Sequence, residues 1–379
     1  MKITYLDNSA TTAVCEQAAQ KALYMMTEVY GNPSSLHRLG YEAEQEICKA
    51  REAVASLMGA SAREVFFTSG GTEANNLLVI GAAHAAIRRG KHIVTTAVEH
   101  ASVTEACNAL EKEGFSITRL LPDENGCISA DAIADACRAD TVLVTIMLVN
   151  NETGARFSLE QAVPRIRKKS PHAFIHCDAV QAAGKIPLLA TKWKLDGMTV
   201  SAHKLHGPKG CGAAYLRRGA RISPRQFGGK QQDGIRPGTE AVPLIAAFGA
   251  AINALPPLPQ QQAHFEQLQA HLWEKLAVIP GVVVHRTHQG VPYIVHLSVP
   301  GLRSETMLHF LSERNIFVSS GSACSKGAKS PVLTAMGLPA DHIDSALRIS
   351  FCHQNTLADI DRFADALSEA AMVLARKKP

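Results

Sequence analysis

Short apolar runs alternate with stretches of helical spacing between about residues 45 and 250. Several runs are apolar on both faces and rich in Val, Ile, Phe and Thr. Continuous apolarity is typical of strands in a mostly parallel sheet that helices cover on both sides. The expected strands are Val65 to Ser69, His92 to Ala97, Val142 to Val149, Ala173 to Asp178, Gly197 to Ala202 and Gly212 to Leu216. Because helical stretches such as Glu73 to Arg89 and Ser158 to Lys169 separate them, the pattern predicts an α/β fold.

The pattern changes near Leu255. Pro256, Pro257 and Pro259, followed by the glutamines up to Gln262, indicate a hinge or linker. Beyond it, strands are expected at Val282 to His285, Tyr293 to Ser298, Ile316 to Ser319 and Leu347 to Phe351. We therefore expect a large domain over residues 15–254 and a smaller α+β domain made of residues 1–14 and 255–379.

A last helix is expected to begin near Thr356, because Thr356 and Asp359 form a T-x-x-D capping pattern. Its apolar residues keep roughly helical spacing, so one face should pack on the C-terminal strands. They are Leu357, Ile360, Phe363, Leu367 and Leu374.

Composition narrows the class of protein. The 379 residues are 46% hydrophobic, carry a net charge of +5, and show no apolar stretch near the ~20 residues of a membrane span. The short basic run from Arg165 to Lys169 is typical of a solvated helix face, so no direct nucleic-acid binding is expected.

The nine cysteines lack C-x-x-C spacing, and no secretory signal is visible, which predicts reduced thiols in a cytoplasmic enzyme. Metal-ligand spacings are also missing, so no metal site is expected.

Three segments carry candidate chemistry. In Thr68 to Glu73 a strand ends in two glycines before a helix, where backbone N–H groups suit a phosphate; an ordinary turn with Thr72 as N-cap is the alternative. Asp178 ends a strand, where an aspartate can keep a pyridine nitrogen protonated; a helix N-cap is the alternative. Lys204 follows another strand and suits Schiff-base chemistry, with Lys209 in the next turn as its competitor.

Together these segments resemble the fold type I pyridoxal-phosphate enzymes, and within them the cysteine desulfurases of the nitrogen-fixation and iron–sulfur-assembly type (class V aminotransferase family). The resemblance spans nearly the whole chain. It rests on residues 5–12 (YLDNSATT), 31–35 (GNPSS), 98–102 (VEHAS), 149–154 (VNNETG), 236–240 (RPGTE) and 347–351 (LRISF), in this order. It implies a fold type I transferase with a large mostly parallel domain and a smaller α+β domain.

The resemblance also assigns roles. It implies that Lys204 carries pyridoxal 5'-phosphate, that Asp178 pairs with the ring nitrogen and that Gln181 contacts the ring phenolate oxygen. The cofactor phosphate would be held by Gly71, Thr72, Ser201 and His203, and by Thr239 of a neighbouring subunit in a homodimer. His100 would stack on the ring and move protons, Asn151 would contact the ring or the substrate, and Arg348 and Asn32 would bind the substrate carboxylate.

Cys324 decides between sulfur transfer and transamination. It lies in SSGSACSKG between small residues and just before Lys326 and Lys329, which predicts an exposed, mobile loop where a thiolate is favoured. The resemblance implies that Cys324 takes sulfur from L-cysteine as a persulfide, leaving L-alanine. The sulfur would pass to an acceptor protein, such as an iron–sulfur scaffold or a transfer-RNA thiolation enzyme.

Some residues depart from the family pattern, and other functions stay open. The segment from Ser325 to Ser330 is shorter than in housekeeping members, and Lys230 stands where a glycine is expected. A selenocysteine lyase would use the same pocket, as would another pyridoxal-phosphate-dependent lyase or aminotransferase. A catalytically retired binding subunit is the non-enzymatic alternative.

Overall fold

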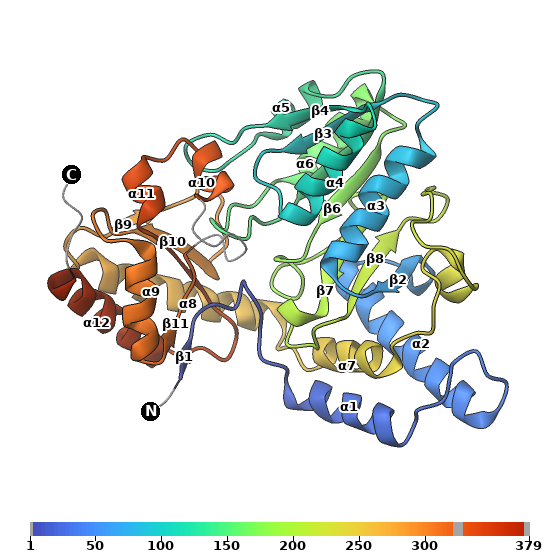
Figure 1. Ribbon diagram of the computed structural model, residues 1–379, viewed down its shortest axis with the longest axis horizontal. Helices are drawn as coiled ribbons and strands as arrows, with labels where there is room; N and C mark the ends of the chain where they lie inside the picture. The colour runs from blue at the N-terminus through green and yellow to red at the C-terminus, as the bar shows by residue number, and fades with distance from the viewer. Residues whose placement is uncertain (1–2, 321–328, 375–379) are drawn as a thin grey trace.

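A computed structural model describes residues 3–320 and 329–374. A seven-stranded sheet forms the larger part of it, in the order β2-β8-β7-β6-β5-β3-β4 (Figure 1). Its strands are β2 (Val65–Thr68), β3 (His92–Thr96), β4 (Ser116–Leu120), β5 (Thr141–Met147), β6 (Phe174–Asp178), β7 (Gly197–Ser201) and β8 (Gly212–Leu216). All neighbours pair in parallel except β8, which is antiparallel to both β2 and β7. The predicted mostly parallel sheet is therefore confirmed, and β4 is a strand that the pattern did not predict.

Helices cover both faces of this sheet. They are α1 (Glu16–Thr27), α2 (Arg38–Met58), α3 (Gly71–Ala85), α4 (Ala101–Lys112), α5 (Ala130–Asp135), α6 (Leu159–Lys169) and α7 (Val242–Asn253). Side chains of α3 and α4 share one apolar core with Phe66, whereas those of α2, α5 and α6 share another with Val65 and Phe67. Alternate residues of β2 thus face opposite layers, which is the expected packing of a strand buried on both sides.

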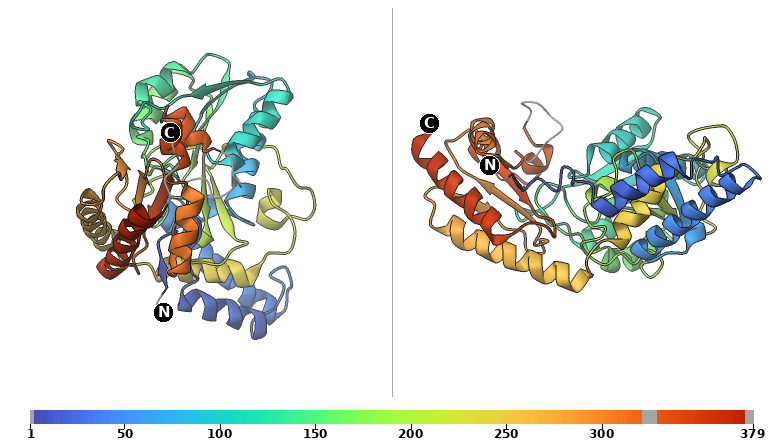
Figure 2. Two further views of the ribbon diagram at one scale, coloured as in Figure 1. Left: turned by 60° about the vertical axis from the view of Figure 1, so that its left-hand side comes forward. Right: turned by 90° about the horizontal axis from the view of Figure 1, so that it is seen from below.

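The C-terminal elements form a separate group beside the sheet (Figures 1 and 2). Strands β9 (Val283–His285), β10 (Ile294–Ser298) and β12 (Ala346–Ser350) make an antiparallel sheet in the order β12-β10-β9. Strand β11 (Ile316–Phe317) pairs instead with β1 (Thr4–Tyr5), so the N-terminal segment joins this group. Helices α8 (Leu258–Ala277), α9 (Ser304–Glu313), α10 (Pro331–Ala335), α11 (Ala340–Asp344) and α12 (Leu357–Val373) complete it. Thr356 and Asp359 form the predicted capping box of α12, and Ile360, Phe363 and Leu367 are buried.

The proline-rich stretch, predicted to be a hinge or linker, lies largely in helix α8. Pro257 is the N-cap of α8 and Pro259 lies in its first turn, where a proline needs no N–H partner. Buried Gln261 donates from Nε2 to the carbonyls of Gly184 and Pro256, so the glutamines belong to a packed helix. Only residues 254–257 separate α7 from α8, which meet at 75°.

Within the described residues, no individual helix has the length and apolarity needed to cross a membrane. The bent pair α7 and α8 meets that test together, on length and composition only.

Three histidines of the C-terminal group pack together in a largely buried cluster. From this cluster we predict that the protein loses stability in acid. The His285 ring lies 5.1 Å from the His296 ring and 5.4 Å from the His342 ring, measured between centroids. His296 is buried and neither ring nitrogen has a hydrogen-bond partner among the described residues. Burial lowers the pKa of His296 to about 3 and that of His285 to about 4.

An unfolded histidine titrates near 6.5, so the unfolded chain binds more protons than the folded one below that pH. The contribution of the neutral rings to the free energy of unfolding is complete above pH 6.5. It falls as the pH drops toward 3 to 4. Proton uptake by His296 in the unfolded chain should lower the free energy of unfolding at pH 5 by roughly 2 kcal/mol, relative to its value at neutral pH. Urea unfolding at pH 7 and pH 5 should show a smaller pH dependence for His296→Leu than for the wild type; equal dependence would contradict the prediction.

Candidate active site

The residues singled out from the sequence follow neighbouring parallel strands. Strands β7, β6, β5 and β3 are adjacent and parallel, so their carboxyl ends lie on the same edge of the sheet. Asp178 ends β6, Lys204 follows β7, Asn151 follows β5 and His100 follows β3. Ligands of open α/β sheets bind at this edge. Helix α3 also begins here, because the position of a Cβ added to Gly71 would lie 3.6 Å from Ser201 Cβ.

Lys204 ends a short 3-10 helix, Ala202–Lys204, directly after β7. Its partly buried Nζ donates to the carbonyl of Ser9 and, at 2.7 Å, to the carbonyl of Ala10. Loss of hydration, followed by the positive charges of Arg348 and Lys185, lowers the pKa of Lys204 to about 7. A substantial share of this amine is therefore uncharged near neutral pH, as nucleophilic or basic lysine chemistry requires.

Asp178 lies at the centre of a hydrogen-bond network. Its Oδ1 accepts from the Val180 N–H at 3.0 Å and its Oδ2 accepts from Asn75 Nδ2 at 2.7 Å. Asn75 Nδ2 also donates to Ser102 Oγ at 2.8 Å, and Ser102 Oγ lies 2.8 Å from His100 Nδ1. No helix begins at Asp178, so the alternative of a helix N-cap is wrong.

The start of α3 offers free N–H groups. Gly70 is its N-cap and makes no side-chain cap hydrogen bond, so the alternative with Thr72 as N-cap is wrong. Gly212 on β8 packs against this turn, since an added Cβ would come within 2.7 Å of Gly70 backbone atoms. With no side-chain cap, the N-terminal N–H groups and the helix dipole favour an anion at this position.

Ser201 lies beside the α3 terminus, and His203, two residues further along, contacts the N-terminal segment. His203 Nδ1 lies 3.2 Å from Thr11 Oγ1, and the His203 carbonyl accepts from Thr12. Burial, followed by the charges of Lys204 and other cations, lowers the pKa of His203 to about 4. The His203 ring is therefore neutral near neutral pH.

Gln181 is buried after β6. Its Nε2 donates to the Ser9 carbonyl at 2.9 Å, while its Oε1 has no partner among the described residues. An unpaired buried polar atom is costly unless a ligand or water contacts it. The side chain therefore has unused hydrogen-bonding capacity in the site.

Arg348 on β12 is buried and reaches two other segments. One guanidinium nitrogen donates to the Asn151 carbonyl at 2.9 Å, and another pairs with Asp7 Oδ1 at 2.7 Å. Asp7 belongs to the N-terminal segment that also supplies the carbonyls bonded to Lys204. The arginine is thus held at the junction of the N-terminal segment, the loop after β5 and the C-terminal sheet.

Two predicted residues are not brought to this site in the single chain. Asn32 is exposed in the loop between α1 and α2, which lies at the far end of the molecule from the C-terminal group (Figures 1 and 2). Thr239 is also exposed, after Gly238. The expectation that Asn32 joins Arg348 is therefore not met within one chain.

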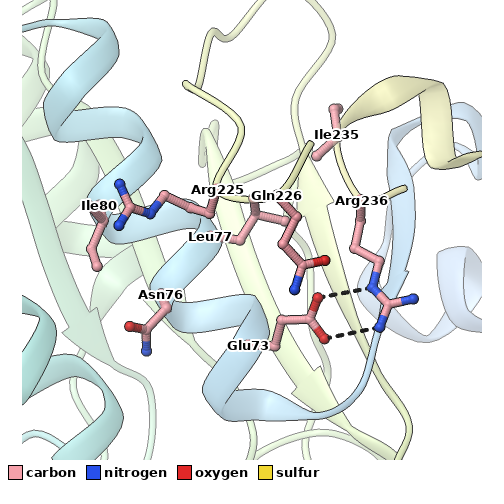
Figure 3. Close-up of a pocket in the computed structure, with 8 residues that line it drawn as sticks. All are labelled: Glu73, Asn76, Leu77, Ile80, Arg225, Gln226, Ile235 and Arg236. Atoms are coloured by element: carbon pink, nitrogen blue, oxygen red, sulfur yellow. Dashed lines mark hydrogen bonds and ion pairs between the residues drawn. The ribbon is translucent and has the colours of Figure 1, made fainter. Parts of the chain in front are cut away.

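The segment before Thr239 is tied to α3 by an ion pair. Arg236 Nε lies 2.9 Å from Glu73 Oε1, beside a cavity of about 260 Å³ (Figure 3). The cavity is lined by Glu73, Asn76, Leu77, Ile80, Arg225, Gln226, Ile235 and Arg236. None of these is a predicted cofactor contact, and the Glu73–Arg236 ion pair forms part of the cavity wall.

Cys324 lies outside the described residues. The other eight cysteines are free thiols, and five of them are buried. Burial raises the pKa of Cys107 and Cys211 to about 12, so these thiols stay protonated near neutral pH and are poor nucleophiles. Where the structure describes the chain, no group of His, Cys, Asp or Glu is arranged to hold a metal ion.

Sequence reasoning missed several residues of the site. Asn75 and Ser102 connect Asp178 to His100, Asp7 pairs with Arg348, and Asn150 fixes the loop after β5 by accepting from the N–H groups of Glu152 and Thr153. Asp7, Ser102 and Asn150 lie inside the motifs that carried the resemblance, so the motifs marked them without giving their partners. Asn75 lies inside helix α3 and outside these motifs, so nothing in the sequence marked it.

The chain is similar to known proteins over nearly its whole length. The family described as aminotransferase class-V matches residues 4–363. The chain is 38% identical to "Cysteine desulfurase IscS" of Methanosarcina thermophila, over 100% of this chain and 94% of that one. A solved structure of a "NifS-like protein" superposes with a TM-score of 0.93 at 35% identity, covering 98% of this chain and 100% of that chain. The structure described as "SspA in complex with cysteine" is 31% identical with a TM-score of 0.82, covering 92% and 98%.

Proposed function

The chain belongs to the class-V aminotransferase family, and on this basis we propose that it is a cysteine desulfurase dependent on pyridoxal 5'-phosphate. The observation that carries the proposal is the meeting of Lys204, Asp178 and Arg348 in a chain that resembles cysteine desulfurases over its whole length. A partly uncharged amine, a buried carboxylate and a buried guanidinium are the groups that an amino-acid reaction on a pyridine cofactor needs.

The chain's residues fit this cofactor. Lys204 would attach it, Asp178 would pair with the ring nitrogen, and the unpaired amide oxygen of Gln181 marks hydrogen-bonding capacity available to it. Its phosphate would lie on the uncapped start of α3, held by Gly71, Thr72, Ser201 and His203, with His100 and Asn151 at the ring. When bound, pyridoxal phosphate supplies an electron sink next to the substrate Cα, which no side chain provides.

Each residue then has a defined task. Arg348 would bind the α-carboxylate of L-cysteine through paired hydrogen bonds, and the Lys204 amine would remove the proton on Cα. The Cys324 thiolate would attack the substrate sulfur, forming an S–S bond while the Cβ–S bond breaks and its electron pair stays on carbon. Protonation of that carbon and return of a proton to Cα give L-alanine, and the sulfur remains on Cys324 as a persulfide for an acceptor protein.

The test is the product formed from L-cysteine by the purified protein with added pyridoxal phosphate and reductant. We expect L-alanine and sulfide, with L-cysteine used at least as efficiently as L-selenocysteine. A strong preference for L-selenocysteine would instead support a selenocysteine lyase, and pyruvate in place of alanine would support a β-elimination enzyme. Purified protein that binds no cofactor and forms no product would contradict the proposal.

We also propose that two chains form the active unit. Helix α1 and the segment that follows it expose large apolar side chains, namely Leu23, Tyr24, Met26, Tyr30, Leu36 and Tyr41. Exposed apolar groups of this kind are typical of subunit interfaces. Asn32 lies in the same segment, and both Asn32 and Thr239 are exposed, so a partner subunit can receive them at its own site.

Sedimentation equilibrium should therefore give the mass of a homodimer. The double variant Leu23→Glu and Tyr24→Glu should shift the population toward single chains and weaken cofactor retention, because Thr239 would no longer reach a partner. A wild type that stays monomeric at micromolar concentration and still retains cofactor would contradict this proposal.

A further inference from the structure

We propose that Asn75 and Ser102 are positioning residues that hold neutral His100 with its proton on Nε2. His100 then presents Nε2–H as a fixed hydrogen-bond donor, rather than an unprotonated nitrogen that could take the proton of a substrate thiol. The assignment of the proton rests on geometry alone, and only its consequence for sulfur chemistry rests on the proposed function.

The first step is the contact at His100 Nδ1. His100 is the N-cap of α4, and its Nδ1 accepts from the Ser102 backbone N–H at 3.1 Å. A backbone N–H can only donate, so Nδ1 must carry a lone pair. In a neutral imidazole with an accepting Nδ1, the proton is on Nε2.

The second step is the direction of the Ser102 hydroxyl. Ser102 Oγ lies 2.8 Å from His100 Nδ1 and also 2.8 Å from Asn75 Nδ2. Because the Asn75 amide donates to this oxygen, the hydroxyl hydrogen is available for Nδ1. Ser102 thus offers two donors to the same ring nitrogen, one from its backbone and one from its side chain.

The third step is the orientation of the Asn75 amide. Asn75 is 1% exposed, and its Nδ2 lies 2.7 Å from Asp178 Oδ2 as well as beside Ser102. A flipped amide would place its oxygen against a carboxylate oxygen at that distance, which is two acceptors in contact. The Asp178 carboxylate therefore fixes Asn75, and Asn75 occupies one lone pair of the Ser102 hydroxyl. The Ser102 backbone N–H, together with the free hydroxyl hydrogen, favours the His100 tautomer that is protonated on Nε2.

A proton held on Nε2 limits what His100 can do in the reaction. A proton added to Nδ1 would turn the contact with the Ser102 backbone N–H into a contact between two donors and would remove the cap of α4. His100 is therefore suited to stabilising negative charge that develops near Nε2, such as that on a thiolate. The proton of the substrate thiol then has to go to a group other than the Nε2 of His100.

Nitrogen-15 NMR of histidine-labelled protein tests the tautomer directly, in the purified protein with and without pyridoxal phosphate. His100→Gln identifies the signal by its loss. We expect a protonated Nε2 and an unprotonated Nδ1 in the wild type, with the same pattern in Ser102→Thr, which keeps the hydroxyl. Ser102→Ala and Asn75→Ala keep the backbone N–H donor, so they should show a smaller population of the Nε2–H tautomer rather than its complete loss.

Kinetics give a second readout. Ser102→Ala should lower kcat by roughly 10-fold and alter the pH profile with little change in KM, whereas Ser102→Thr should restore both. A wild-type His100 protonated on Nδ1 would overturn the proposal. So would an unchanged tautomer pattern and unchanged pH profile in both Ser102→Ala and Asn75→Ala. Since NMR needs no turnover, a failed desulfurase assay would leave the tautomer result intact.

Discussion

Lys204→Ala is expected to lower the rate of alanine formation from L-cysteine by about 10³-fold or more, because it removes the group that takes the Cα proton. The wild-type amine suits this task since burial, followed by the charges of Arg348 and Lys185, lowers its pKa to about 7. The variant should also lose the covalent attachment of the cofactor. Mass spectrometry after borohydride reduction should therefore find bound cofactor on the wild type and none on the variant.

Lys209→Ala is the matched control, because Lys209 lies five residues further along in an exposed turn. It should keep the covalent cofactor and a rate within about twofold of the wild type, as surface substitutions usually do. Cofactor attached to Lys209 in the Lys204→Ala protein would contradict the assignment of Lys204.

Cys324→Ala is expected to abolish sulfur transfer, lowering alanine formation by roughly 10³-fold or more, as loss of a catalytic nucleophile does. Cofactor binding should be unchanged, because the groups proposed to hold the cofactor are residues of other segments. The variant should therefore keep the visible absorbance of the bound cofactor and still respond to added L-cysteine. Alanine assays and absorbance spectra on the same samples separate the two effects.

Cys48→Ala provides the control for cysteine replacement. Cys48 is a partly exposed free thiol on α2, so its removal should leave both readouts unchanged. Full desulfuration by Cys324→Ala would show that another thiol or water accepts the sulfur, and the assigned mechanism would be wrong.

The strands that the sequence predicted best are those buried on both faces. Strands β3, β5, β6 and β7 are buried along their whole length because helices cover both sides, and apolar residues, threonine and histidine make up most of their sequence. Strand β4 was missed because it lies at the edge of the sheet and its residues 116–120 (SITRL) are mostly half-buried, with a mixed polar pattern. The prolines near residue 257 indicated a break, but proline in the first turn of a helix and proline in a linker look alike in sequence.

In the site, too, some residues could be predicted from the sequence and others could not. Residues at strand ends, such as Asp178 and Lys204, could be predicted because strand ends can be located from local patterns. The partners of these residues could not, since Asn75 bonds to Asp178 across 103 residues and Asp7 bonds to Arg348 across 341. Contacts of that kind depend on how the elements pack, which no local pattern records. Asn32 and Thr239 need a second subunit to reach a site, so a single chain leaves their roles as predictions.

The most direct measurement is a single turnover of the wild-type protein with L-cysteine and no reductant, with products and protein analysed together. The account predicts equal amounts of L-alanine and of a Cys324 peptide that carries one added sulfur atom. Pyruvate with free sulfide, and no added sulfur on Cys324, would contradict it.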